Sequence, residues 1–317
     1  MSSIADSDAA DRADTMIRVV IGPTAAGKSR IALALAEARS LGIVSADSRQ
    51  VYRAFDIGTA KPSAAERARV PHAGIDVLDP MPRYSAHAWA AHADGWCEDF
   101  VATGRHPVVV GGTGFYIRAL VSPLDVVPAL DTAARTELGR WLEQLDAATL
   151  ARWVARLDPD RLRYGRTQHL RAVETALLSG TRLGDALRAP SASARPVRYL
   201  VVDPGAPLAE RIARRVHAMV ANGWLDEVER LVSTVPDDAP AWNASGYETF
   251  RHCVTGHLQQ RDAVERVIIE TRQYAKRQRT WCRHQLPAEC VTQLNPDQGD
   301  AIERAIDWWD SGSGATE

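Results

Sequence analysis

The sequence is poor in the features that define several classes of protein. Its four cysteines lie far apart and form no CxxC pair. This spacing argues against a disulfide framework or a zinc ribbon, and it suits the reducing cytosol. No apolar stretch forms a signal peptide or a membrane anchor, and the Ala- and Asp-rich residues 1–15 are predicted to be a disordered tail. We therefore expect a cytoplasmic, monomeric protein that does not enter membranes.

An excess of charge of one sign is also missing. The net charge is −2, which gives no sign of a nucleic-acid partner but does not exclude local basic clusters. The sequence contains no internal repeat and no purine-specificity motif such as NKxD. His252, Cys253 and His257 are close together, but no second pair of metal ligands accompanies them, so we interpret them as ordinary helix residues. Hydrophobic residues make up 45% of the chain, enough for a substantial core.

Short β-branched runs alternate with helical patterns in the first part of the chain. A helix is predicted over 28–39, and strands are predicted over 17–21, 42–46, 75–78 and 107–110. Strands that alternate with helices in this way form parallel sheets with helices on both faces. The sequence therefore predicts an α/β core.

The character of the sequence changes after residue 121. Residues 131–190 show only helical periodicity, and the stretch 189–196, which contains Pro and Ser, is interpreted as a linker. Strand character returns at 197–202, and long helices are predicted from there to the end. We therefore predict a phosphate-binding core interrupted by an all-helical insertion, with these bounds: core 16–121 and 196–317, insertion 122–195.

A phosphate-binding loop follows the first predicted strand. The pattern G-x-x-x-x-G-K-[ST] is matched by Gly22, Pro23, Thr24, Ala25, Ala26, Gly27, Lys28 and Ser29. Glycines let the backbone curl so that several N–H groups point at one anion. Lys28 can neutralise phosphate oxygens, and the hydroxyl of Ser29 can bind Mg²⁺. The motif predicts a bound phosphate ester but does not say which one, since a kinase or an ATPase would match it equally well.

Two more polar segments end strands at the same predicted edge of the sheet. Asp47 lies in the first, 45–50, where it can hold Mg²⁺ through water, act as a general base, or serve as a helix N-cap. Thr113 lies in the second, the glycine-rich 110–114. The glycines there permit either a close approach of the backbone, with Thr113 offered to a substrate, or a tight turn with positive φ.

One arginine interrupts an apolar helix face. Leu208, Ile212, Arg215 and Met219 fall on one side of a predicted helix. A guanidinium that points towards a core needs an anion, which can be an internal carboxylate or a substrate diphosphate, unless the side chain extends to solvent.

Two basic clusters favour a polyanionic partner. Arg272, Lys276, Arg279 and Arg283 share an arc of about 60° on one helix. The second cluster falls within the predicted insertion and comprises Arg161, Arg163, Arg166, His169 and Arg171. Most charge runs are merely solvated faces, but two clusters in two domains can clamp a phosphate backbone between them.

Six segments in order carry a resemblance to a known family. They are GPTAAGKS (22–29), SADSRQVY (45–52), DIGTAKP (56–62), VVGGTGFYIRAL (109–120), RIARRVHAMVANGWLDEV (211–228) and TRQYAKRQRTW (271–281). Together they resemble the bacterial tRNA dimethylallyltransferases, also called tRNA isopentenyltransferases, over roughly residues 17–285. The phosphate loop is widely shared, whereas SADSRQVY, DIGTAKP and TRQYAKRQRTW are far more specific.

The resemblance implies a reaction and the residues that perform it. Dimethylallyl diphosphate would be the donor, with Mg²⁺. The acceptor would be the exocyclic amine of the adenosine 3′ of the anticodon, in tRNAs that read codons beginning with U. Asp47 resembles the family's general base and Thr24 its diphosphate-contacting hydroxyl, with Lys28 beside it. Arg215 resembles the diphosphate-binding arginine, and Arg211 lies close enough to compete for this role.

The resemblance also implies contacts with the anticodon stem-loop of tRNA. The matching positions, together with members of the basic helix stripe, are Asp47, Ser48, Arg49, Gln50, Thr113, Arg135, Thr167, Gln168, His169, Leu170, Arg171, Arg272, Lys276 and Arg279. The usual HPND…QRIQRALE stretch of the insertion departs here to RYGRTQHLRAVE. The zinc finger of eukaryotic relatives is missing, in accord with the cysteine count.

Three other functions share part of this pattern. An adenylate isopentenyltransferase would have the phosphate loop and the aspartate but would not need two basic clusters. A small-molecule kinase would place ATP in the loop, and an RNA-binding regulatory GTPase or ATPase would lack prenyl chemistry.

Prenyl transfer to adenine requires catalysis by the protein, because the lone pair of the amine is delocalised into the ring and makes the amine a poor nucleophile. A base must remove the amine proton while cations stabilise the departing diphosphate.

Overall fold

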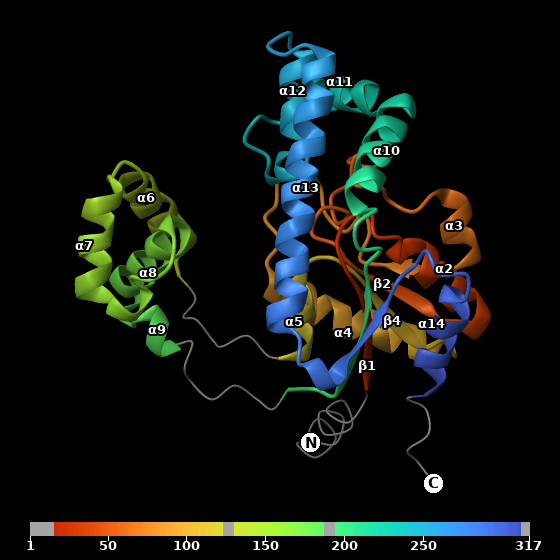
Figure 1. Ribbon diagram of the computed structural model, residues 1–317. Coiled ribbons are helices and arrows are strands. Elements are labelled where there is room, and N and C mark those ends of the chain that lie inside the picture. The colour runs from red at the N-terminus through yellow and green to blue at the C-terminus, as the bar shows by residue number, and fades with distance from the viewer. Residues whose placement is uncertain (1–15, 123–129, 187–193, 312–317) are drawn as a thin grey trace. The chain divides into compact units, whose positions relative to one another are not determined.

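The structure, a computed structural model, describes residues 16–122, 130–186 and 194–311 (Figure 1). It divides into two compact units. The sheet unit comprises Met1–Val121 and Arg195–Glu317, and the helical unit comprises Ser122–Ala194. The predicted tail and most of the predicted linker lie outside the described residues.

The sheet unit is built on six parallel strands in the order β3-β2-β4-β1-β5-β6. The strands are β1 (Ile17–Ile21), β2 (Gly42–Ala46), β3 (His72–Ala73), β4 (Pro107–Gly111), β5 (Val197–Val202) and β6 (Val291–Leu294). Successive residues such as Val19 and Val20 are both fully buried, because alternate side chains point to opposite, covered faces. The predicted parallel sheet with two covered faces is confirmed.

Two predictions about strands were wrong. Residues 75–78 form no strand, because Gly74 (φ 77°) and Asp76 (φ 56°) turn the backbone through the left-handed region. Only Leu78 forms an isolated bridge, to Tyr52. Near the C-terminus, where only helices were predicted, β6 forms the edge of the sheet. Its four residues include two exposed ones, so its pattern did not indicate a buried strand.

Helices cover both faces of the sheet. Helices α2 (Lys28–Arg39) and α14 (Ala301–Asp310) share a core with the strands that includes Ile31, Leu35 and Trp308. Helices α4 (Ala86–Ala102) and α5 (Gly114–Val121) pack together, and Trp89 stacks on Tyr116 between them.

Five further α-helices belong to the described part of the sheet unit. They are α3 (Ala64–Arg69), α10 (Leu208–Ala221), α11 (Trp224–Thr234), α12 (Tyr247–Val254) and α13 (Gln260–Gln285). Helix α13 is the longest and runs from beside α5 to α12, with α10 packed along it (Figure 1). Within the described residues, no helix combines the length and apolar character needed to cross a bilayer.

The helical unit contains four helices in its described part. They are α6 (Thr132–Glu143), α7 (Ala147–Leu157), α8 (Arg166–Ser179) and α9 (Leu183–Ala186). Leu142, Leu150, Val154 and Val173 form its core and are fully buried. The predicted helical character is therefore confirmed where the chain is described. The N–H of Arg195 donates to the carbonyl of Val121 (2.8 Å), so the sheet unit's chain ends meet where the insertion begins and finishes.

Candidate active site

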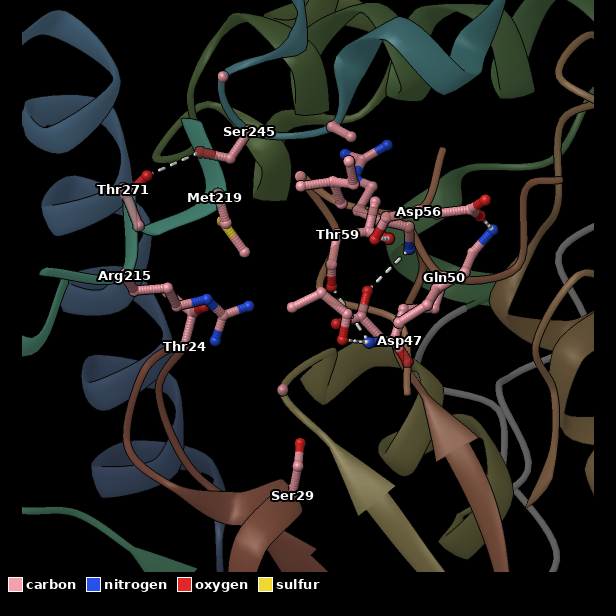
Figure 2. A pocket seen from close by; sticks show the side chains of 18 of the residues that line it. Thr24, Ser29, Asp47, Gln50, Asp56, Thr59, Arg215, Met219, Ser245 and Thr271 are labelled. Carbon is pink, nitrogen blue, oxygen red and sulfur yellow. Dashed lines mark hydrogen bonds and ion pairs between the residues drawn. The ribbon is translucent and has the colours of Figure 1, made fainter. Parts of the chain in front are cut away.

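A cavity of about 1340 Å³ opens at the carboxyl ends of the strands in the sheet unit. The predicted site residues that line it are Thr24, Lys28, Ser29, Asp47, Arg49, Gln50 and Arg215. Figure 2 shows Arg215 and Thr24 facing Asp47 and Gln50 across the open space. Residues from three separate segments of the sequence therefore converge on one site.

The phosphate-binding loop connects β1 to α2 at the base of the cavity. A Cβ atom on Gly22 would lie 2.1 Å from the carbonyl oxygen of Val202, so only glycine fits there. Gly27 adopts φ 95° at the N-cap of α2 and leaves that helix end without a side-chain cap. An uncapped helix N-terminus attracts anions. The loop therefore presents backbone N–H groups and the positive end of a helix to the cavity.

Lys28 lies within this loop, and its ammonium donates to the carbonyl of Pro23 (2.8 Å). Burial, and then the positive charge of Arg215, lower the pKa of Lys28 to about 8, while the charge of Asp47 opposes the shift. Two cations held close together in a buried site favour a dianionic or trianionic ligand such as a diphosphate.

Asp47 directly follows β2, and it is not a helix N-cap. The residues after it form turns, and its carboxylate Oδ1 accepts a hydrogen bond from the N–H of Arg49 (2.8 Å). The next residue, Ser48, donates its N–H to the hydroxyl oxygen of Thr113 (3.0 Å). The predicted alternative of a helix cap is therefore wrong, and the carboxylate is instead fixed by its own turn at the edge of the cavity.

The glycines after β4 serve close approach rather than a left-handed turn. Gly111 and Gly112 are absent from the positive-φ glycines of the described chain. A Cβ atom on Gly111 would lie 2.2 Å from the carbonyl oxygen of Ala46 in β2. The alternative of a turn with positive φ is therefore wrong, and these glycines let two loops meet beside Asp47.

Arg215 reaches the cavity from α10, between buried Ile212 and Met219. Burial lowers the pKa of its guanidinium, and the charge of Asp47 opposes this shift. Among the described residues no hydrogen bond or ion pair engages Arg215, whereas Arg211 pairs with Asp297 and donates to the carbonyl of Ala26 (3.3 Å). Arg211 therefore braces the phosphate loop, and Arg215 is the cation that faces the cavity.

The segment 56–62 forms another wall, held by a buried carboxylate that the sequence analysis missed. Glu227 is 5% exposed and accepts hydrogen bonds from the N–H of Asp56 (3.1 Å), the N–H of Ile57 (2.8 Å) and the hydroxyl of Tyr247 (2.5 Å). Gln50 adds bonds from its amide to the carbonyls of Thr59 and Ala60 (3.1 and 3.0 Å). The available signal was an acidic residue on the apolar face of α11.

Gln278 of α13 is a second residue that the sequence analysis missed. It is 8% exposed, accepts from the N–H of Thr24 (2.8 Å) and donates to the carbonyl of Gly112 (2.9 Å). It lies on the same face of α13 as Tyr274 and Trp281 rather than on the cationic stripe, and this position was the available signal.

The basic stripe on α13 is only partly open. Arg279 forms a bidentate pair with Asp203 (2.8 and 2.5 Å) and donates to the carbonyl of Gly205, which accounts for its charge within the protein. Arg272 is exposed and donates to the carbonyl of Ala209 (3.4 Å). Lys276 and Arg283 are exposed.

The basic residues of the helical unit form a group of their own. Arg135 pairs with Glu174 (3.0 Å), and Arg166 donates to the carbonyl of Glu143 (2.8 Å). Burial, and then the charges of neighbouring arginines, lower the pKa of Arg171. The predicted contact residues Thr167, Gln168, His169 and Leu170 occupy the start of α8 beside them.

His252 and Cys253 lie in α12, and His257 lies in the turn after it rather than in a helix. His257 contacts the hydroxyl of Thr255 (2.9 Å), and His252 lies 3.4 Å from Glu248. Across the part of the chain that the structure describes, no three His, Cys, Asp or Glu side chains gather into a metal-binding group.

Comparison with known proteins adds family-level information. Residues 50–285 match the family model described as IPP transferase, and residues 15–71 match one described as isopentenyl transferase. The chain is 40% identical to the tRNA dimethylallyltransferase of Anaeromyxobacter sp. (strain Fw109-5) over 296 residues, which cover 91% of this chain and 98% of that protein.

Solved structures are also similar over nearly the whole chain. The full-length tRNA isopentenylpyrophosphate transferase of Bacillus halodurans has a TM-score of 0.67 and 29% identity, covering 93% of this chain and 96% of that one. A eukaryotic dimethylallyltransferase, described as acting on tRNA, has a TM-score of 0.79 and 25% identity, covering 94% of this chain and 80% of that one.

Proposed function

The chain belongs to the IPP transferase family, and from this premise we propose that it transfers a dimethylallyl group from dimethylallyl diphosphate to tRNA. The acceptor in this proposal is the exocyclic amine of the adenosine 3′ of the anticodon, in tRNAs that read codons beginning with U. The observation that carries the proposal is the convergence of a phosphate cradle, an unpaired arginine and a carboxylate on one cavity.

The donor diphosphate is assigned to the phosphate-binding loop. Thr24 and Lys28 of the loop line the cavity, and Arg215 of α10 lies on the same side of it as Thr24 (Figure 2). These groups would stabilise the negative charge that grows on the diphosphate as the bond from its oxygen to the prenyl carbon breaks. Arg215 is suited to this because its guanidinium can bind two phosphate oxygens at once.

Asp47 is assigned as the general base. The amine nitrogen forms a bond to the prenyl carbon, the carbon–oxygen bond to diphosphate breaks, and the amine proton passes to the Asp47 carboxylate. Only one oxygen of Asp47 is held by the N–H of Arg49, so the carboxylate is oriented and keeps acceptor capacity for the proton. The adenine must leave its stack to enter the cavity, as it does for other enzymes that modify bases.

The residues present also fit a magnesium ion. Mg²⁺ takes one or two protein oxygens and completes its octahedral shell with water and substrate phosphates. Ser29 carries such an oxygen on the first turn of α2, and the carboxylate of Asp47 lines the same cavity. When bound, Mg²⁺ would neutralise charge on the diphosphate and make it a better leaving group. The phosphate-binding loop could also bind the phosphates of ATP, so the experiment below follows ATP hydrolysis together with prenyl transfer.

The tRNA partner is assigned to two sets of residues. Ser48, Arg49, Gln50 and Thr113 lie beside Asp47 in the sheet unit, with Lys276 and Arg272 exposed on α13. Arg135, Arg171 and the start of α8 supply the contacts in the helical unit. Because Arg279 is paired with Asp203, we assign it to holding α13 rather than to tRNA.

Incubation with labelled dimethylallyl diphosphate and Mg²⁺ tests the proposal. Unmodified tRNA, AMP and no acceptor are offered in parallel, and ATP hydrolysis is followed in the same reactions. We expect label on tRNA alone, lost when the target adenosine is replaced. Label on AMP would instead identify an adenylate isopentenyltransferase. ATP turnover without transfer of the label would identify a kinase or an ATPase.

A further inference from the structure

Gln278 lines the cavity and connects two of the loops that form its wall. Its buried side chain extends from α13 between the phosphate-binding loop and the glycine-rich loop after β4. The amide oxygen accepts from the N–H of Thr24 (2.8 Å), and the amide nitrogen donates to the carbonyl of Gly112 (2.9 Å). A Cβ atom on Gly112 would lie 2.2 Å from the amide nitrogen, so the glycine is what admits this contact.

Only one orientation of one side chain satisfies both partners. A glutamine carries a donor and an acceptor on the same carbon, whereas glutamate at neutral pH offers acceptors only and methionine offers neither. Rotating the amide by 180° would set its N–H group against the N–H of Thr24 and its oxygen against the oxygen of Gly112. The contact therefore requires a neutral amide in a defined orientation, not merely a polar residue of this length.

The two loops that Gln278 joins carry the two halves of the proposed reaction. Thr24 belongs to the cradle assigned to the donor diphosphate. Gly112 adjoins Thr113, whose hydroxyl oxygen accepts from the N–H of Ser48, the residue after Asp47. One continuous series of hydrogen-bonded loops thus leads from the diphosphate cradle to the proposed base, and Gln278 is its central member.

We propose that Gln278 is a positioning residue that sets the distance between the donor cradle and the Asp47 side of the site. This inference rests on the proposed function, because it supposes that the donor occupies the loop and the acceptor amine approaches Asp47. Gln278 touches neither substrate in this proposal and acts through Thr24 and Gly112. In-line displacement requires the reacting atoms to be aligned within a small tolerance, and a misplacement of about 1 Å can lower the rate by about 10²-fold.

Replacing Gln278 with methionine removes both hydrogen bonds and keeps nearly the same length. We expect Gln278→Met to lower kcat by about 10- to 100-fold, while the KM for tRNA changes less than about threefold. Leu231→Ala is the matched control, because Leu231 is buried in α11 and does not line the cavity. Leu231→Ala should lower the stability of the fold but leave kcat per folded molecule unchanged. Gln278→Met would behave in the same way if Gln278 had only a structural role.

Replacing Gln278 with glutamate gives a readout that fold stability alone cannot produce. The ionised carboxylate accepts from Thr24 but faces the carbonyl of Gly112 without a proton to donate. The protonated carboxyl can satisfy both partners, as the amide does. The kcat of Gln278→Glu relative to the unsubstituted protein should therefore rise about tenfold as the pH falls from about 8.5 to about 5.5. Protonation of Asp47 at low pH should lower kcat in both proteins, so its effect cancels when the two values are divided.

Binding of inorganic pyrophosphate, followed by calorimetry, separates this inference from the proposed function. Gln278→Met should bind pyrophosphate about tenfold more weakly, and Gln278→Glu should regain affinity at the lower pH. If the unsubstituted protein prenylates no tRNA, the proposed function fails, and the pyrophosphate titration still decides the role of Gln278. A ratio for Gln278→Glu that is constant across pH, or a Gln278→Met variant with unchanged kcat and pyrophosphate affinity, overturns the inference.

Discussion

The two walls of the cavity are built in different ways. The strand wall, made of the loops 47–50 and 111–113, is tied together by hydrogen bonds between Asp47 and Arg49 and between Ser48 and Thr113. The helix wall, made of Ile212, Arg215 and Met219 on α10, has none that engages its arginine among the described residues. One wall is held rigid by the protein itself, whereas the other carries a charge that is satisfied only when a ligand arrives.

This difference assigns separate tasks to the two walls. A general base works best when its position is set before the substrate binds, which the turn at Asp47 provides. A half-buried cation such as Arg215, which no ion pair engages among the described residues, gains most from an anionic ligand. The comparison therefore predicts that changes to the strand wall lower the rate of transfer, and that changes to the helix wall lower the affinity for the donor.

The largest effect is expected at Asp47. Asp47→Ala should lower kcat by about 10²- to 10⁴-fold, the contribution typical of a general base. Pyrophosphate should bind at least as tightly as before, since a nearby negative charge is removed. Single-turnover transfer of labelled dimethylallyl and pyrophosphate calorimetry measure the two quantities. Asp47→Asn serves as the isosteric control and should be equally slow; an active Asp47→Asn would end the assignment of a base.

Arg215, with Arg261 as its control, provides a test of the helix wall. Arg215→Ala should raise the KM for dimethylallyl diphosphate about 10- to 100-fold, because a charge-assisted bidentate contact is lost. Arg261 is exposed, pairs with Glu265 on α13 and does not line the cavity, so Arg261→Ala should change this KM less than about twofold. Equal damage from the two substitutions, or a loss of tRNA affinity alone in Arg215→Ala, would contradict the separation of tasks.

The affinity for pyrophosphate should depend on pH through Lys28. Its pKa in the free protein is about 8, so the charged form is lost as pH rises through that value. A bound anion favours the charged form, and the affinity should fall up to about tenfold per pH unit above 8. Since the folded-state pKa lies below the unfolded value, folding of the free protein should become more favourable between pH 8 and 10.5.

Calorimetry of pyrophosphate binding across this pH range measures the Lys28 effect. Lys28→Met is the control, because pyrophosphate itself also ionises and its contribution remains in the variant. The difference in slope between the two proteins isolates the lysine. Identical slopes would show that Lys28 does not titrate on ligand binding.

The smallest effect is expected at Thr113. Thr113→Val removes the acceptor for the N–H of Ser48 and should lower kcat about three- to tenfold, as expected for one hydrogen bond. Thr103→Val is the control: the Thr103 hydroxyl bonds only to carbonyls at the exposed end of α4, so its transfer rate should not change. If Thr113→Val lowered the affinity for the donor and left kcat unchanged, the assignment of the strand wall to the rate of transfer would be contradicted.

The parts of the fold that sequence analysis predicted are those with strong local patterns. The runs at 17–21 and 197–202 are central strands buried on both faces, and both formed as predicted. The run at 75–78 is also mostly apolar, but it follows Gly74, whose left-handed backbone turns the chain out of the sheet. Strand β6 was missed because an edge strand needs only one covered face and tolerates exposed polar residues.

The residues of the candidate site also fall into those that local sequence patterns predicted and those that they did not. The phosphate-binding loop and Asp47 belong to local segments whose spacing indicates their chemistry. The roles of Glu227 and Gln278 depend on partners about 170 and 254 residues away in the chain. No local pattern encodes such pairings, because they exist only after the helices have packed. The choice between Arg211 and Arg215 likewise required the position of Asp297, which contacts only the first of them.

The contact between Val121 and Arg195 bears on how the molecule can evolve. Because the chain departs from the sheet unit and rejoins it at a single point, whatever is attached there does not have to fit the spacing of the strands. The entropic cost of closing a longer excursion rises only with the logarithm of its length. The helical unit can therefore be enlarged, shortened or exchanged while the cradle and the carboxylate stay where they are. Under the proposed function, selection can alter which RNA is recognised without rebuilding the site of transfer.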